Sequence, residues 1–202
     1  MLREFRCIQD CSDCCIYRQY YPSVDYGKIG VLLLPEEKKE IENLAQVHKI
    51  NLTIFPRLGI GVNKKSNGPS QVIAYQLMGT NINGDYCPFL DIKSSNRSPH
   101  GGFNCMIYNR RPLSCRAYPA IKESKMEVEL DNNCRFSCQH SNQVGKNLLD
   151  NELSALTRIS NNFERFAEQV IWRYATHIGD EPFMKLLLPR GWYLQDNENH
   201  QH

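Results

Sequence analysis

The sequence predicts an α+β fold, in which a small, irregular, cysteine-rich domain with a few short strands and helices precedes a long C-terminal helix. Nine of the 202 residues are cysteines, and residues 79–119 are rich in Gly, Pro, Asn and Ser. From residue 147 to 178, apolar residues recur at helical spacing. We expect a cysteine-rich domain at 1–145, a helical extension at 146–194 and a disordered tail at 195–202.

The regular elements before the long helix follow from local patterns. Residues 35–48 are expected to form a helix, because Pro35 suits a first helical position and two acids follow it. Residues 52–62 and 71–78 are rich in strand formers and flank a turn-like segment. Residues 126–130 alternate apolar and polar side chains, which predicts a third strand.

The net charge and the hydropathy of the chain argue against nucleic-acid-binding and membrane-spanning proteins. The formal net charge of +2 is too small to indicate nucleic acid as an obligate partner. No stretch approaches the roughly 18 apolar residues that a membrane helix needs. The first residues have no apolar run of the kind that a signal peptide contains. We therefore expect a cytoplasmic protein that does not span a membrane.

Nine cysteines in such a chain indicate metal binding, because cysteine-rich chains in a reducing compartment more often hold metal than disulfides. Residues 79–119 support this interpretation. A stretch of that length without regular structure is unusual in a small domain. Metal ligation by its cysteines would supply the missing constraint. We expect the cysteine-rich domain to be metal-bound.

The cysteines fall into four groups along the chain. They are Cys7-x3-Cys11-x2-Cys14-Cys15, then Cys87-Pro-Phe-Leu, then Cys105 with Cys115, and finally Cys134-x3-Cys138. A tetrahedral zinc site takes four thiolates, and a [4Fe–4S] cluster also takes four. Nine cysteines are therefore enough for one or two such sites, and at least one cysteine would not be a ligand. The residues alone do not distinguish zinc from an iron–sulfur cluster.

Arginines accompany the later cysteines and are candidates for contacts to the bound group. Arg111 and Arg116 lie beside Cys115, where their donors could bond the sulfurs and offset the negative charge of the thiolates. The alternative is that they form surface ion pairs. His100 and His140 lie near cysteines and could be mixed ligands, although exposed loop positions are the simpler interpretation.

The string Cys105-x-Ile-Tyr-x-x-Arg-Pro-x-x-Cys115-Arg-x-Tyr-Pro is the most specific motif. Together with the other cysteine groups, it resembles the YkgJ-like cysteine cluster family, which carries a CxxCxxCC zinc- or iron-chelating domain. The resemblance covers residues 5–138, with three residues instead of two between Cys7 and Cys11, and Cys138 is additional. The resemblance implies metal chelation by a set of eight cysteines, which are Cys7, Cys11, Cys14, Cys15, Cys87, Cys105, Cys115 and Cys134.

Three functions are compatible with these observations. The first is a protein that chelates an iron–sulfur cluster or zinc, with an unknown reaction. The second is an iron–sulfur-dependent enzyme similar to the flagellin lysine methylases, which resemble this chain in their cysteine module. The third is an interaction module that zinc stabilises and whose C-terminal helix docks on a protein partner. An exposed apolar stripe on that helix would favour the third.

Overall fold

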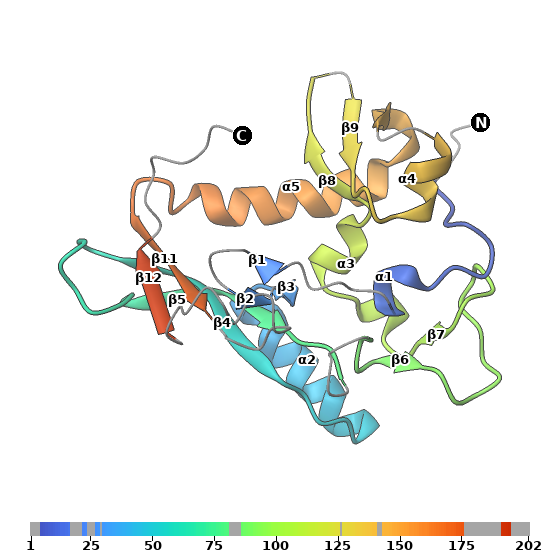
Figure 1. Cartoon of the computed structure of the whole chain (residues 1–202), viewed down its shortest axis with the longest axis horizontal. Helices are drawn as coiled ribbons and strands as arrows, with labels where there is room; N and C mark the ends of the chain where they lie inside the picture. Colours follow the sequence, from blue (N-terminus) through green and yellow to red (C-terminus); the bar gives the residue numbers. More distant parts are fainter. Residues whose placement is uncertain are drawn as a thin grey trace. The chain divides into compact units, whose positions relative to one another are not determined.

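The computed structural model describes most of the chain. The described residues are 5–16, 22–23, 27–28, 30–80, 86–125, 127–140, 143–175 and 191–194. Contacts divide the chain into two compact units (Figure 1). Unit 1 comprises Met1–Arg18 and Asp85–Glu164, and unit 2 comprises Gln19–Gly84 and Arg165–His202. The predicted domains at 1–145 and 146–194 remain a prediction about independent folding, and the predicted disordered tail lies outside the described residues.

Unit 1 joins short helices to two small antiparallel sheets, which agrees with the predicted α+β class. Its first sheet has the order β10-β9-β8, and its second pairs β6 with β7. The strands are β6 Leu90–Asp91, β7 Asn104–Cys105, β8 Ala120–Glu123, β9 Glu127–Leu130 and β10 Gln143–Gly145. The helices are α1 Asp13–Ile16, η1 Tyr108–Arg110, α3 Leu113–Ala117, α4 Arg135–His140, η2 Lys146–Leu148 and α5 Asp150–Glu164.

The core of unit 1 forms where β9 and α5 present apolar side chains to each other. Val128 and Leu130 of β9 are fully buried, whereas Glu127 and Glu129 are exposed, as the predicted alternation requires. Phe5 meets Phe136 edge to face, with ring centroids 4.8 Å apart. The buried cluster contains Ala120, Val128, Leu130, Cys134, Phe136, Leu149 and Leu153. This core holds the N-terminal segment against the sheet.

The predicted long C-terminal helix is wrong in its length. Helix α5 ends at Glu164, and Val170–Ala175 forms strand β11. The run Val-Ile-Trp-Arg-Tyr is rich in β-branched and aromatic residues, which favour a strand once a partner strand is available. That partner is β4, which pairs with β11 in antiparallel fashion. The helical spacing beyond Glu164 was therefore coincidental.

The apolar face of α5 packs within unit 1. Leu153 and Ala155 are buried, and the helix contacts α3 and β8. Leu156 is partly buried against the same core. A protein partner on this stripe, which an exposed face would have favoured, therefore has no support from the structure.

Unit 2 is built on a five-stranded antiparallel sheet in the order β12-β11-β4-β5-β3. A two-stranded sheet pairs β1 Pro22–Ser23 with β2 Gly27–Lys28. The predicted strands at 52–62 and 71–78 are confirmed as β4 and β5. The strands of the main sheet are β3 Val31–Leu33, β4 Ile54–Gly61, β5 Gln71–Leu77, β11 Val170–Ala175 and β12 Gly191–Leu194.

The predicted helix at 35–48 is confirmed as α2, Pro35–His48. A carboxylate oxygen of Glu37 accepts a hydrogen bond from the Leu34 N–H at 2.9 Å, which satisfies a free donor at the helix start. Lys49 adopts a left-handed conformation and ends the helix. The helix buries Ile41, Leu44 and Ala45 and packs against β3 and β5 (Figure 1).

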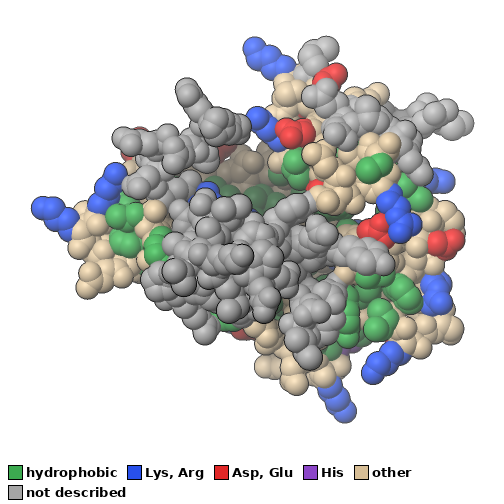
Figure 2. Space-filling model, in the orientation of Figure 1, with side chains coloured by type: hydrophobic (Ala, Val, Ile, Leu, Met, Phe, Trp, Pro, Cys, Tyr) green, Lys and Arg blue, Asp and Glu red, His purple; other side chains and the backbone are tan. Residues whose placement is uncertain are grey.

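Helix hydropathy and surface charge complete the description of the fold. None of the described helices combines the length and the apolar character that crossing a bilayer requires. On the face shown in Figure 2, the described Lys and Arg side chains stand singly and are interspersed with acidic ones. Such a distribution fits the small net charge of the chain.

Candidate metal site

Seven cysteine side chains of unit 1 line a single cavity with a volume of about 380 Å³. They come from three of the four cysteine groups of the sequence. They are Cys7, Cys11, Cys14, Cys15, Cys105, Cys115 and Cys134. All nine cysteines are free thiols in the structure, so no disulfide competes for these sulfurs.

The first cysteine group reaches the cavity through a close contact between two loops. The hydroxyl oxygen of buried Ser12 accepts a hydrogen bond from the Phe103 N–H at 2.7 Å. The Asp10 N–H donates to the carbonyl oxygen of His100 at 2.8 Å. Gly102 lies against Ser12 and the carbonyl group of Cys11, where a β-carbon would overlap both. A glycine at this position is what lets the two loops meet.

We expect Gly102→Ala to separate these loops, because its β-carbon would overlap the carbonyl group of Cys11. Overpacking of this kind costs about 1–3 kcal/mol. Thermal unfolding should show a lower Tm, and the purified protein should hold less metal. Gly145→Ala is the matched control, since a β-carbon there meets only Asn147 Oδ1, at 3.1 Å. Equal Tm values for the two variants would contradict this role.

Short helix α1 brings two adjacent thiols together. The N–H groups of Cys15 and Ile16 both donate to the carbonyl oxygen of Ser12, which forms a single turn. The sulfur atoms of Cys14 and Cys15 lie 3.8 Å apart. Zinc–sulfur bonds of about 2.3 Å place two sulfurs of one tetrahedron about 3.8 Å apart. This pair therefore already has the spacing of two ligands on one zinc ion.

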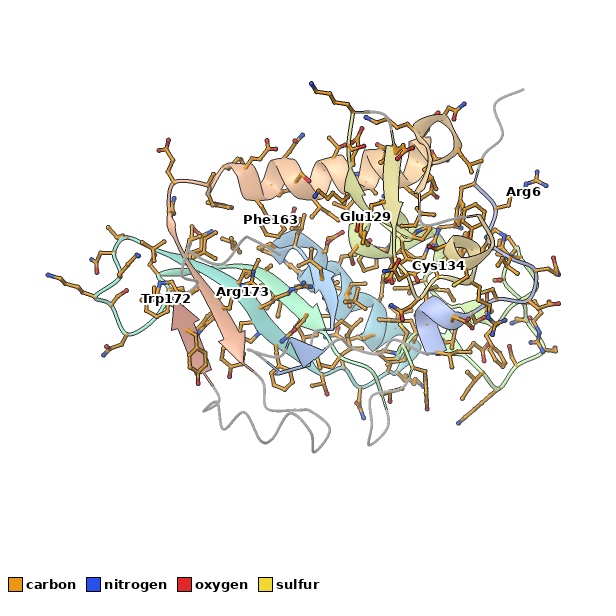
Figure 3. The ribbon with its side chains drawn as sticks, turned by 45° about the horizontal axis from the view of Figure 1, so that its top comes forward. Arg6, Glu129, Cys134, Phe163, Trp172 and Arg173 are labelled. Atoms are coloured by element: carbon orange, nitrogen blue, oxygen red, sulfur yellow. The ribbon has the colours of Figure 1, made fainter. Side chains whose placement is uncertain are left out.

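An ion pair joins the last cysteine group to the first, and a hydrogen bond joins Cys134 to Tyr118. Arg135, at the start of α4, pairs with Asp13 of α1 at 2.6 Å. Cys134, which is labelled in Figure 3 and directly precedes Arg135, is buried. It lines the cavity. The Tyr118 hydroxyl bonds its sulfur. Burial, followed by the charge of Cys134, raises the pKa of Tyr118, so that its hydroxyl keeps the proton it donates.

The thiols influence one another electrostatically, which shows that they are close neighbours. Burial, followed by the charges of Cys11 and Cys14, raises the pKa of Cys7 to about 12. Burial also raises the pKa of Cys105, to which Cys115 and Cys14 contribute. Cys14 is thus common to two sets of interacting thiols. A bound cation would relieve the cost of forming several thiolates in this space.

The sulfurs surround the cavity without converging on one point. Within the described parts of the chain, no group of three or more His, Cys, Asp or Glu side chains is arranged as metal ligands would be. The donor set nevertheless fits a thiophilic metal, since thiolates are ligands of zinc and of iron–sulfur clusters. A metal would have to draw the thiols together from the cavity wall.

The two remaining cysteines lie outside the cavity lining. Cys87 is buried, and its N–H donates to the carbonyl oxygen of Cys15 at 2.7 Å. Cys138 is exposed, and its sulfur approaches the carbonyl oxygen of Asn132 at 3.7 Å. The structure thus places Cys87 beside the first cysteine group through its backbone and leaves Cys138 at the surface.

Both predicted arginines line the cavity. The Arg111 Nε donates to the carbonyl oxygen of Tyr108 at 3.0 Å, and its guanidinium lies 4.0 Å from the centroid of the Tyr108 ring. Its charge lowers the pKa of Cys105 against the larger effect of burial. Arg116 is exposed at the end of α3. His100 also lines the cavity, and burial, followed by the charge of Arg111, lowers its pKa.

Sequence reasoning did not identify the residues that position the thiols. Ser12 and Gly102 are not specified by any motif, and their contacts join distant parts of the chain. Tyr118 belongs to the Cys115-Arg-x-Tyr-Pro motif, but its contact with Cys134 was not predicted. The pair Gly101-Gly102 beside His100 was the one local sign that two backbones approach closely here.

One comparison with known proteins gives a match. The model of a family with the CxxCxxCC signature, described as "Putative zinc- or iron-chelating domain", matches residues 6–149. This range includes all nine cysteines of the sequence. No curated protein and no solved structure matches the chain at a significant level.

Proposed function

The chain belongs to the CxxCxxCC family of zinc- or iron-chelating domains, and on this premise we propose that its cysteine thiolates bind zinc or a [4Fe–4S] cluster inside the cavity of unit 1. The observation that carries the proposal is the gathering of seven thiols from three separate cysteine groups around one space. Buried thiols scattered through a core would have no reason to share a cavity.

The proposed ligands are the eight cysteines of the family pattern. Seven of them line the cavity, and Cys87 is the eighth, joined to Cys15 by a backbone hydrogen bond. We propose that Arg111 and Arg116 offset part of the negative charge of the thiolates. Zinc held there would stabilise the fold, and an iron–sulfur cluster would in addition accept and donate single electrons.

Cys115→Ser tests this proposal, because it removes one cavity thiol from α3. We expect metal content to fall and residues 79–119 to become more sensitive to protease, since ligation constrains that segment. Zinc and iron are measured by mass spectrometry on protein purified without oxygen, and limited proteolysis follows the segment.

Cys138→Ser is the matched control, because Cys138 is exposed and lies outside the cavity lining. It should keep the metal content and protease resistance of the parent chain. Equal metal content in the Cys115→Ser variant and the parent would remove Cys115 from the ligand set. Absence of both metals from the parent would overturn the proposed function.

A further inference from the structure

The cavity is larger than its proposed metal requires. A sphere with the zinc–sulfur bond length of about 2.3 Å as its radius holds about 50 Å³. One such centre would leave about 330 Å³ of the 380 Å³ available. Pockets for small organic ligands begin at about 300 Å³. The space therefore accommodates a small molecule beside the metal.

The wall of this cavity also contains a cation whose position is fixed before any ligand arrives. Arg111 is held by the hydrogen bond from its Nε to the Tyr108 carbonyl oxygen and by stacking on the Tyr108 ring. Among the described residues, its two terminal amino groups have no hydrogen-bond partner, and none of its donors bonds a cysteine sulfur. A planar guanidinium with both amino groups available is suited to a bidentate oxyanion.

The charges around Arg111 favour an anion with a single charge. Both acids of the cavity wall already have partners, since Asp13 pairs with Arg135 of the same wall and Glu152 makes an interaction of its own. Arg116 adds a second cation to the wall, and within the described residues it makes no ion pair. The thiolates of the same cavity wall would repel a dianion such as phosphate more strongly than a monoanion.

The remaining wall suits the body of an organic ligand. Leu90, Phe103 and Phe5 contribute apolar surface to the cavity. We propose that the cavity binds a small organic monocarboxylate beside the metal, with Arg111 holding the carboxylate and the apolar side chains contacting its hydrocarbon part. This inference rests on the proposed function, because the thiol wall is taken to hold the metal.

The test titrates the full-length protein, purified with its metal, with benzoate, inorganic phosphate and benzyl alcohol in a calorimeter. Benzoate should bind saturably, and phosphate and benzyl alcohol should bind at least tenfold more weakly. Arg111→Lys keeps the charge but loses the planar fork, and should weaken benzoate binding by about tenfold to hundredfold. Phosphate or benzyl alcohol binding as tightly as benzoate would overturn the proposal.

Arg97→Lys is the matched control. Arg97 also lies over an aromatic ring, that of Phe103, but it does not line the cavity. It should bind benzoate like the parent chain, and equal weakening by both variants would overturn the role of Arg111. Because Arg111→Lys could impair folding, backbone NMR of the parent provides a second measurement. Benzoate should shift the amides of residues 108–116 and leave those of 93–97 unchanged, and the reverse would contradict the site.

Metal content is measured in every sample. Failure of the carboxylate proposal can then be distinguished from failure of the proposed metal binding. Protein that retains stoichiometric metal but binds no benzoate contradicts the carboxylate site alone. Protein that contains neither zinc nor iron contradicts the proposed function, whatever its affinity for benzoate.

Discussion

Cys14→Ser is expected to lower metal affinity by about 100-fold or more, which should exceed the effect of Cys7→Ser. Structural zinc sites with four ligands bind with about 10–16 kcal/mol, so that one ligand accounts for roughly 3 kcal/mol. Cys14 interacts electrostatically with Cys7 on one side and with Cys105 on the other. Its sulfur is also 3.8 Å from that of Cys15. Its loss should therefore affect both sets of thiols.

Chelator competition measures the affinity of each variant, and metal content gives the stoichiometry. Cys138→Ser again serves as the reference, since its exposed thiol lies outside the cavity lining. If Cys14→Ser and Cys138→Ser bind zinc equally well, Cys14 is not a ligand, and the link between the two sets of thiols is wrong.

Metal affinity is also expected to fall steeply as the pH is lowered from 8 to 6. Burial and, after it, the neighbouring thiols raise the pKa of Cys7 from its ordinary value of 9.0 to about 12, so that its thiol is protonated over this range in the metal-free protein. Metal binding must then release that proton. Each proton released lowers the affinity about tenfold per unit of pH decrease, or about 100-fold from pH 8 to pH 6.

Raising the pH has the opposite effect on the stability of the metal-free protein, which should fall. A folded-state pKa above the unfolded value adds stability at pH values below 9.0, and this stability is lost as the pH rises toward about 12. Chelator competition at pH 6, 7 and 8 measures the first effect, and unfolding of the metal-free protein above pH 9 measures the second. An affinity that is constant with pH would show that the ligands are not buried thiols.

The parts of the fold that the sequence predicted correctly depend on local chemistry. Helix Pro35–His48 follows from a proline and acids at its start, and Val128 and Leu130 follow from simple alternation. The predicted long helix failed at Glu164, because pairing with β4 determines the structure of Val170–Ala175 and lies far away in the sequence. Local periodicity does not report such pairing.

The candidate site likewise combines features that follow from local sequence with features that depend on contacts between distant residues. The family resemblance names eight cysteines as candidate ligands, and that assignment stays a prediction. Seven of the eight line the cavity, and Cys87 does not. Their arrangement depends on contacts such as that between Ser12 and Phe103, which are 91 residues apart. The motif from Cys105 to Pro119 contains both Tyr108 and Arg111, but their stacking and the cavity beside the thiols arise from packing, which the motif does not describe.

X-ray absorption at the zinc and iron edges tests the central claim most directly, because it reports the atoms bound to the metal. On full-length protein purified without oxygen, the metal present should have sulfur neighbours at about 2.3 Å. Protein with an iron–sulfur cluster should also be brown, whereas protein with zinc alone should be colourless. A coordination shell of nitrogen and oxygen alone, or a protein without either metal, would contradict a thiolate-bound metal in this cavity.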